Sequence, residues 1–415
     1  MGSQRPAAMA SPPSRRARWI ALLVSSAIAL LVGEIALRIA GVSHPNFYRP
    51  DRVRGWGLIP GASGRWHSEG DALVEINRDG FRGPERAHGR VGGTFRVAVL
   101  GDSCAEAVQV AYEETFVARL ERDLQACPAL AGRRVEALDF GVAGYGTAQE
   151  LLTLRAQAAA FAPDLVLLAF YSGNEVRNNS RALDADPARP YFALADDRLI
   201  EDDSFRSTRS FRVRSSWAAG LLYGAFNHVR LLQLGKNAQT ALRTAIGTAR
   251  ARRNETGAAL QELGLDNAVY APPSDPQWTD AWQITERLWR ELAVESAALG
   301  ARFGIVSLTT PMQVNPDRAE REAFARRLGV ADLFYPDDRA VAWGKAEGVP
   351  VLALARPLQT AVDAEPATEH RPLHGFPNTK PGEGHWNANG HRAAAERLAP
   401  WVCEVLGTPA PATPR

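Results

Sequence analysis

The sequence predicts an α/β fold, a three-layer α/β/α arrangement with about five parallel strands, preceded by a transmembrane helix. The first observation is a series of short apolar runs, each followed by turn residues and a helical stretch, as expected for buried parallel strands. The second is a hydrophobic content of 46% in 415 residues, enough for a sizeable core. The third is an apolar run near the N-terminus. The expected strands are Phe95–Leu100, Arg134–Phe140, Asp164–Tyr171, Phe303–Leu308 and Val349–Leu354. Strands that alternate with helices in this way are typical of the doubly wound, flavodoxin-like architecture.

The N-terminal apolar run, residues 19–42, predicts a transmembrane signal-anchor. It is long enough to cross a hydrocarbon layer of about 30 Å, and Glu34 and Arg38 are four apart, so they can pair on one helix face. The preceding residues 1–18 form a basic tail that should stay in the cytoplasm, which places the rest of the chain outside. A cleaved signal peptide is the alternative. The absence of an A-x-A site after the run favours an uncleaved anchor.

The remaining chain divides by composition. Residues 43–93 are rich in Gly, Pro and Arg and predict an irregular collar. The main domain should span residues 94–406, with a helical insertion at about 204–260, because the stretch after the third strand greatly exceeds an ordinary crossover. The Pro-, Thr- and Ala-rich residues 407–415 predict a disordered tail.

The insertion is unusually basic. Between residues 204 and 254 the chain has ten Arg or Lys residues and no Asp or Glu, interleaved with leucines. This pattern predicts basic amphipathic helices that contact anionic lipid or an acidic glycan. The alternative is the solvated face of a helical cap. The net charge of the whole chain is only +2, which does not suggest a nucleic-acid partner.

The three cysteines have no metal-binding spacing. Cys127 and Cys403 could form a disulfide in an oxidising compartment, or both could be buried thiols. Cys104 is expected to pack as a small hydrophobic side chain.

Ser103 is the leading candidate for a nucleophile. The tripeptide Gly101-Asp102-Ser103 follows the first strand, which places the hydroxyl at the carboxyl edge of the sheet, beside helix-end N–H groups. The alternative is a turn in which Ser103 only caps a helix. Three further segments favour the catalytic interpretation: GVAGYG after the second strand, SGNE after the third, and GEGHWNANGH near the C-terminus.

This ordered series resembles the SGNH (GDSL) hydrolase superfamily, whose four sequence blocks contribute Ser, Gly, Asn and His. The resemblance extends from about residue 77 to about residue 406, and INRDGFRG before the first block is similar to the membrane-anchored bacterial branch. It implies the SGNH hydrolase fold and a serine esterase that needs no cofactor or metal. The residues carried over are Ser103 as nucleophile, His385 as base, and Ser103, Gly144 and Asn174 as oxyanion-hole donors.

The acid of the triad departs from the family pattern. Many relatives have Asp three residues before the histidine, but that position is Gly382 here. Others, including alginate-acetylation enzymes, use Asp-x-His, which Glu383-Gly384-His385 resembles with Glu in place of Asp. We therefore expect Glu383 to be the acid. The alternative is that a backbone carbonyl orients His385 and that Glu383 is a surface charge.

Together these features predict a single-pass esterase of the bacterial cytoplasmic (inner) membrane, with its catalytic domain facing the periplasm or cell exterior. The expected substrate is a carboxylic ester, such as the O-acetyl groups of a cell-envelope glycan. An O-acyltransferase with the same site is the first alternative. An alternative of another class is a catalytically vestigial glycan-binding or assembly protein.

Overall fold

The computed structural model describes residues 14–196, 198–239, 267–366 and 371–407. Its centre is a five-stranded parallel sheet with the strand order β11-β10-β7-β5-β6. The strands are β5 (Thr94–Gly101), β6 (Arg134–Asp139), β7 (Leu165–Phe170), β10 (Arg302–Ser307) and β11 (Val351–Ala353). All five predicted strands are therefore confirmed, and β11 is shorter than expected.

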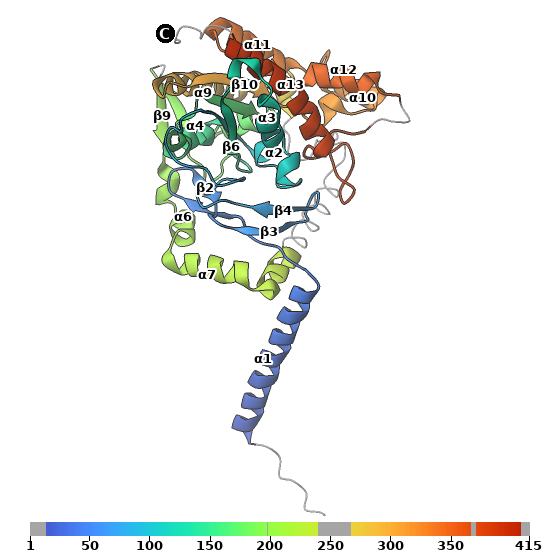
Figure 1. Ribbon diagram of the computed structural model, residues 1–415. Coiled ribbons are helices and arrows are strands. Elements are labelled where there is room, and N and C mark those ends of the chain that lie inside the picture. The colour runs from blue at the N-terminus through green and yellow to red at the C-terminus, as the bar shows by residue number, and fades with distance from the viewer. Residues whose placement is uncertain (1–13, 197, 240–266, 367–370, 408–415) are drawn as a thin grey trace, which may run out of the picture.

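Helices cover both faces of the sheet, which confirms the three-layer α/β/α prediction (Figure 1). Successive residues of β5 point to opposite faces: Val97 and Val99 join one core, and Ala98 and Leu100 join the other. The helices of the first core include α3 (Phe116–Leu124), α12 (Ala355–Ala364) and α13 (Ala388–Gly407). Those of the second core include α4 (Thr147–Ala156), α9 (Pro276–Ala298), α10 (Arg318–Leu328) and α11 (Tyr335–Glu347).

The collar is more regular than predicted. It contains two antiparallel hairpins, β1 (Tyr48–Asp51) with β2 (Gly55–Leu58), and β3 (Ser63–Trp66) with β4 (Ala72–Glu75). Its apolar residues form a separate small core with residues that follow β5 and β6. This core comprises Phe47, Leu58, Val74, Ile76, Val108, Val142 and Tyr145. The expectation of an irregular segment was wrong. Apolar residues are sparse among the Gly and Pro residues of this segment, so its strand pattern is weak. They are nevertheless enough for short strands that pack on a neighbouring surface.

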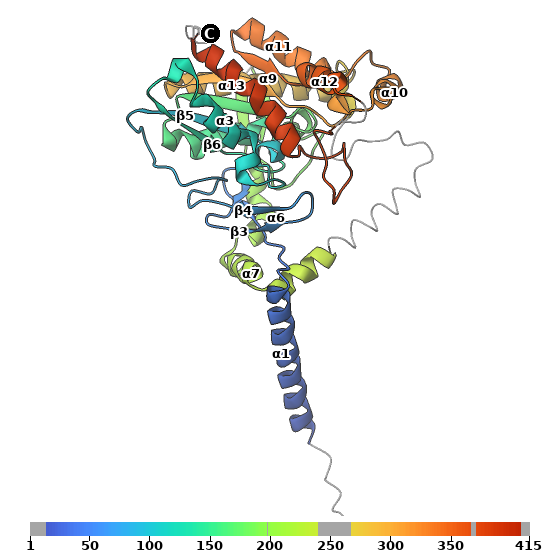
Figure 2. The same cartoon turned by 45° about the vertical axis from the view of Figure 1, so that its right-hand side comes forward.

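The N-terminal helix α1 (Arg15–Ile39) is long and apolar enough to span a membrane, and it projects away from the domain (Figures 1 and 2). Its last turns contact the insertion. Arg38 Nη2 donates a hydrogen bond to the carbonyl of His228 (2.6 Å), and the Glu34 carboxylate accepts hydrogen bonds from the backbone N–H groups of Arg230 and Leu231 (3.1 Å each).

The insertion is helical where it is described, with α6 (Arg209–Arg214), α7 (Trp217–His228) and a further helical segment at 230–239. A hairpin of β8 (Tyr191–Ala195) and β9 (Arg198–Asp202) precedes it. Three predicted segments lie outside the described residues: most of the basic tail (1–13), the end of the helical insertion (240–260) and the C-terminal tail from 408.

A disulfide joins Cys127 to Cys403, with the Cα atoms 5.7 Å apart, while Cys104 is buried and free. The bond connects the segment after α3 to the last helix, and it closes a loop with a sequence separation of 276. Of the two alternatives left open for these cysteines, the structure therefore has the disulfide.

Cys403→Ser should lower the free energy of unfolding by about 2–4 kcal/mol, because the bond limits the conformational freedom of the unfolded chain. Urea denaturation of the detergent-solubilised protein, followed by circular dichroism, measures this change. Dithiothreitol should destabilise the wild type by a similar amount and leave the variant unchanged. Equal sensitivity of both proteins to the reductant would contradict this expectation.

Candidate active site

Three of the predicted site residues follow neighbouring strands. Ser103 comes after β5, Gly144 after β6 and Asn174 after β7. Because these strands are parallel and adjacent, their carboxyl ends place the three residues along one edge of the sheet. His385 lies in the loop between α12 and α13. The fold thus brings residues from four distant segments to one place.

Ser103 is the first residue of the short helix α2 (Ser103–Glu106). The helix starts there because the buried Asp102 caps it: Asp102 Oδ1 accepts a hydrogen bond from the backbone N–H of Cys104 (2.9 Å). Burial raises the pKa of Asp102. Within the described part of the chain, the backbone N–H of Ser103 donates no hydrogen bond.

The other end of α2 is braced by Arg82 from the INRDGFRG segment. Its buried guanidinium donates hydrogen bonds to the carbonyls of Glu106 (3.0 Å), Ala107 and Val110 (2.6 Å). These contacts satisfy carbonyl groups that the short helix leaves without partners. The segment that resembled one branch of the family therefore supports the helix that carries Ser103.

His385 lies between Ser103 and a carboxylate of the collar. Its Nε2 is 2.9 Å from Ser103 Oγ, and its Nδ1 is 2.5 Å from Glu69 Oε2. The second oxygen, Glu69 Oε1, accepts a hydrogen bond from the His385 backbone N–H (2.7 Å). Glu69, His385 and Ser103 therefore form one continuous hydrogen-bonded chain, the arrangement that nucleophilic catalysis by serine requires.

The assignment of the acid to Glu383 is corrected by this geometry. The Glu383 carboxylate pairs with the exposed Lys380 side chain and makes no contact with His385. The reason is local: Gly384 has φ +80°, and a Cβ there would lie 2.2 Å from Glu69 Oε1. The space beside the histidine is thus occupied by Glu69, and the glycine of Glu383-Gly384-His385 admits it.

Glu69 sits at the tip of the β3–β4 hairpin, which is fixed to the histidine loop by Asn378. The Asn378 Oδ1 accepts a hydrogen bond from Gly70 N (3.0 Å), and its Nδ2 donates to the carbonyls of His67 (3.0 Å) and Gly70 (2.8 Å). This clamp holds the carboxylate in position. Sequence reasoning missed Glu69 because nothing in SEGD distinguishes its glutamate from a turn residue. The only signals were indirect, namely glycine at both 382 and 384.

The histidine loop is held by residues around His385. Trp386 Nε1 donates to Thr309 Oγ1 (2.8 Å), and the buried His374 contacts both Thr309 Oγ1 (3.0 Å) and the Gly384 carbonyl (2.8 Å). Burial lowers the pKa of His374 to about 3, so this ring is neutral and serves as a scaffold.

The ionisation of the central pair follows from its contacts. Burial acts to lower the pKa of His385, but the hydrogen bond and charge of Glu69 outweigh it, so the pKa is raised above the ordinary value. For Glu69, burial acts to raise the pKa, but the contact with His385 lowers it overall. A carboxylate that remains charged beside the ring favours the imidazolium that forms when serine loses its proton.

Gly144 lies in a turn with φ +77°, a conformation that favours glycine. Its carbonyl accepts hydrogen bonds from Arg189 Nη1 (2.8 Å) and Asn178 Nδ2 (3.3 Å), and the preceding carbonyl, of Ala143, accepts one from Trp56 Nε1 (3.0 Å). The Gly144 N–H itself donates to no group among the described residues. The turn is thus fixed while this N–H stays available to a ligand.

Asn174 precedes α5 (Glu175–Asn178), and its Nδ2 donates to Asp102 Oδ2 (3.0 Å). This contact fixes the amide beside the residue that precedes Ser103. An amide nitrogen carries two hydrogens, and the bond to Asp102 uses one of them.

Glu106 links the collar to the Gly144 turn. Its buried carboxylate accepts hydrogen bonds from Tyr48 Oη (2.8 and 3.0 Å) and from Ala143 N (2.5 Å). Burial raises the pKa of Glu106 to about 7. The collar therefore supports this turn through two of its residues, Tyr48 and Trp56.

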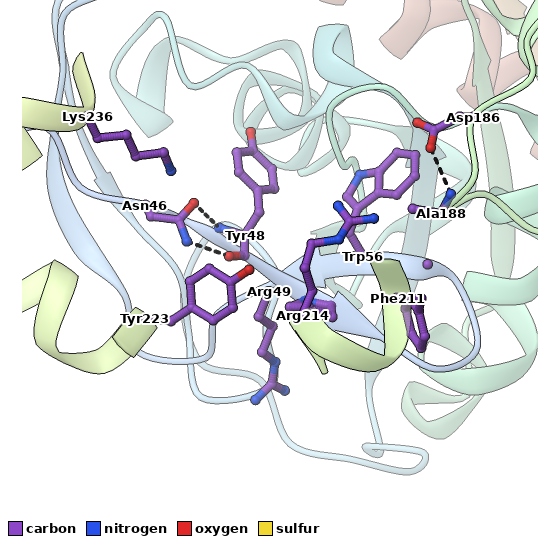
Figure 3. A pocket seen from close by; sticks show the side chains of 12 residues that line it. Asn46, Tyr48, Arg49, Trp56, Asp186, Ala188, Phe211, Arg214, Tyr223 and Lys236 are labelled. Atoms are coloured by element: carbon purple, nitrogen blue, oxygen red, sulfur yellow. Dashed lines mark hydrogen bonds between the residues drawn. The ribbon is translucent and has the colours of Figure 1, made fainter. Parts of the chain in front are cut away.

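A cavity of about 340 Å³ opens where the collar faces the insertion (Figure 3). The aromatic rings of Tyr48, Trp56 and Tyr223 line it together with basic side chains and one acidic residue, Asp186. The basic residues are Arg49, Arg214 and Lys236, and none of them has an ion pair within the part of the chain that the structure describes. Trp56 connects the cavity to the Gly144 turn, because its ring lines the cavity and its Nε1 donates to the Ala143 carbonyl.

Glu69→Gln should lower the pKa of His385, because the amide removes the charge that opposes the effect of burial. The acidic limb of the pH profile should then move to lower pH, and the plateau rate should fall by about 10²- to 10⁴-fold. The rate at which a fluorophosphonate labels Ser103, measured against pH, reports both changes.

Glu383→Gln is the matched control, since its carboxylate pairs with Lys380. This variant should keep the wild-type rate and pH profile. A strong loss in Glu383→Gln together with a normal Glu69→Gln would reverse the assignment.

No family model matches the sequence, and no curated protein matches it. Among solved structures the chain is similar to an alpha/beta hydrolase enzyme from the metagenome of Lake Arreo, Spain, at 12% identity and a TM-score of 0.35, covering 75% of this chain and 95% of that one. It is similar to an acetyl xylan esterase at 10% identity and a TM-score of 0.37, covering 73% and 98% of the two chains. It is also similar to an acetylxylan esterase from Geobacillus stearothermophilus, at 11% identity and a TM-score of 0.34, covering 76% of this chain and 95% of that one. At such low TM-scores these likenesses carry no weight for function, so the function proposed below depends on the geometry of the site.

Proposed function

We propose that the chain is a serine esterase of the SGNH type that forms an acyl-enzyme on Ser103. The observation that carries the proposal is the continuous hydrogen-bonded chain from Ser103 Oγ through the His385 ring to Glu69. Two of the four sequence blocks that resemble the SGNH superfamily supply Ser103 and His385 of this chain, and Glu69 takes the place of the family's acid.

In the proposed reaction His385 Nε2 accepts the hydroxyl proton as Ser103 Oγ attacks the ester carbonyl. The negative charge on the carbonyl oxygen is stabilised by the N–H groups of Ser103 and Gly144 and by the Asn174 amide. The imidazolium then gives its proton to the leaving alcohol. Attack by water, activated by the same histidine, releases the acid and restores Ser103.

The substrate that fits best is an O-acetylated glycan of the cell envelope. Aromatic rings that line the cavity beside the Gly144 turn, Tyr48, Trp56 and Tyr223, offer flat apolar faces for sugar rings. Of the two partners expected for the basic segment 204–254, we propose acidic groups of this glycan for Arg214 and Lys236, because both line the same cavity. Arginines beyond 239 lie outside the described residues.

An O-acyltransferase remains the alternative within the same site, since a sugar hydroxyl in place of water would complete the second step. The vestigial glycan-binding alternative is disfavoured by the complete chain of hydrogen bonds at Ser103. We further propose that α1 anchors the protein in the bacterial inner membrane and that the domain faces the periplasm or exterior. A disulfide between Cys127 and Cys403 supports an oxidising compartment.

Ser103→Ala should abolish hydrolysis of p-nitrophenyl acetate and labelling by a fluorophosphonate, while the circular dichroism spectrum stays unchanged. Acetate release from acetylated glycans, measured with and without an added sugar acceptor, separates hydrolysis from acyl transfer. Full esterase activity in Ser103→Ala would exclude the proposed nucleophile.

Asn174→Ala should lower kcat by about 10²- to 10³-fold with little change in KM, because an oxyanion donor acts mainly in the transition state. Steady-state kinetics with p-nitrophenyl acetate give both constants. A change confined to KM would instead assign Asn174 to substrate binding.

A further inference from the structure

We propose that the apolar face of α7 lies on the membrane surface from which α1 emerges, so that the catalytic domain contacts the bilayer at a second place. This inference rests on the proposed anchoring by α1. It concerns the apolar side chains of α7, which are distinct from the basic ones assigned above to the glycan.

The composition of α7 is unusual for a helix on a protein surface. No residue of the helix is buried, and no charged residue occurs from Trp217 to Asn227. Trp217 is 80% exposed, Leu221 66% and Leu222 71%. A cluster of large apolar side chains of this kind marks an interaction site.

The opposite face of α7 is already occupied by the protein. Gly220, Tyr223 and Gly224 line a cavity between α7 and the collar. Asn227 exchanges two hydrogen bonds with the backbone of Asn46: its Oδ1 accepts from Asn46 N and its Nδ2 donates to Asn46 O, both at 2.9 Å. The helix is therefore fixed to the catalytic domain with Trp217, Leu221 and Leu222 left uncovered.

The position of α7 selects the bilayer as the occupant of this face. The helix runs sideways near the end of α1 in Figure 1 and lies beside that end in Figure 2. Glu34 and Arg38, the first charged residues after the uncharged part of α1, contact the chain at the end of α7, at His228, Arg230 and Leu231. Since the first charges mark the level at which a spanning helix leaves the hydrocarbon, α7 lies at the interface.

The side chains suit this location. Tryptophan is enriched at membrane interfaces, and leucines of an interfacial helix enter the boundary of the acyl chains. Arg212 before α7 and Arg230 after it flank the apolar residues with positive charge that suits anionic headgroups. A helix in the plane of the surface, added to a spanning helix, would fix the tilt of the domain.

The test uses single cysteines in the full chain, labelled with an environment-sensitive fluorophore. The native cysteines do not interfere, because Cys104 is buried and the other two form the disulfide. The test positions are Leu221→Cys and Leu222→Cys in α7. Val341→Cys in α11 is the matched control, since Val341 is also exposed but lies at the end of the molecule away from α1 (Figure 1). Ile28→Cys in α1 reports the membrane anchor itself.

The protein is reconstituted in nanodiscs of phosphatidylcholine and phosphatidylglycerol, with and without brominated acyl chains. We expect blue-shifted emission and at least about twofold stronger bromine quenching at positions 221 and 222 than at 341. Water-like emission at 221 and 222 with strong quenching at 28 would overturn the inference and leave the anchor standing. Loss of quenching at 28 as well would remove the anchor and the inference together. Hydrolysis of p-nitrophenyl acetate by each labelled variant checks its fold and tests the esterase separately.

Discussion

The two hydrogen bonds between the Glu69 carboxylate and His385 are the contact on which the rest of the site depends. One oxygen holds the backbone N–H of the histidine, which fixes the loop, and the other holds Nδ1, which fixes the ring. With both bonds in place, Nε2 lies 2.9 Å from Ser103 Oγ. Hydrogen bonds to a charged group contribute about 1.5–3 kcal/mol each, so this pair outweighs the preference of a loop histidine for other rotamers.

The contact is one of several by which the collar packs on the domain that carries Ser103. The collar places Glu69 beside the histidine, Tyr48 on the Glu106 carboxylate and Trp56 on the Ala143 carbonyl. The segment between the apolar helix and the first strand of the sheet therefore contributes directly to the candidate active site. Its own small hydrophobic core, which includes Val142 and Tyr145 of the turn, keeps these polar contacts in register.

The parts of the fold and site that could be predicted from the sequence are those that a short continuous run of residues determines. Each central strand is a short apolar run, and Ser103, Gly144 and Asn174 follow directly after their strands, so strand order alone brings them together. The carboxylate beside His385 was assigned wrongly to Glu383, because tertiary packing and not proximity in the sequence places Glu69 there. Glu69 and His385 are separated by 316 positions, and no periodicity relates them, whereas the nearby Glu383 matched a short motif. The hairpins of the collar were missed for a similar reason, since their strands are four residues long and stabilised by contacts with other segments.

The positions of Glu69 and His385 in the chain determine when their contact can form during synthesis. The collar is synthesised before Ser103, and His385 follows the last strand of the sheet. The Glu69–His385 contact and the Cys127–Cys403 bond both need this last segment, so neither can form on a partly synthesised chain. A chain whose synthesis has not yet passed residue 385 thus carries Ser103 without the imidazole and the carboxylate contact that complete the arrangement.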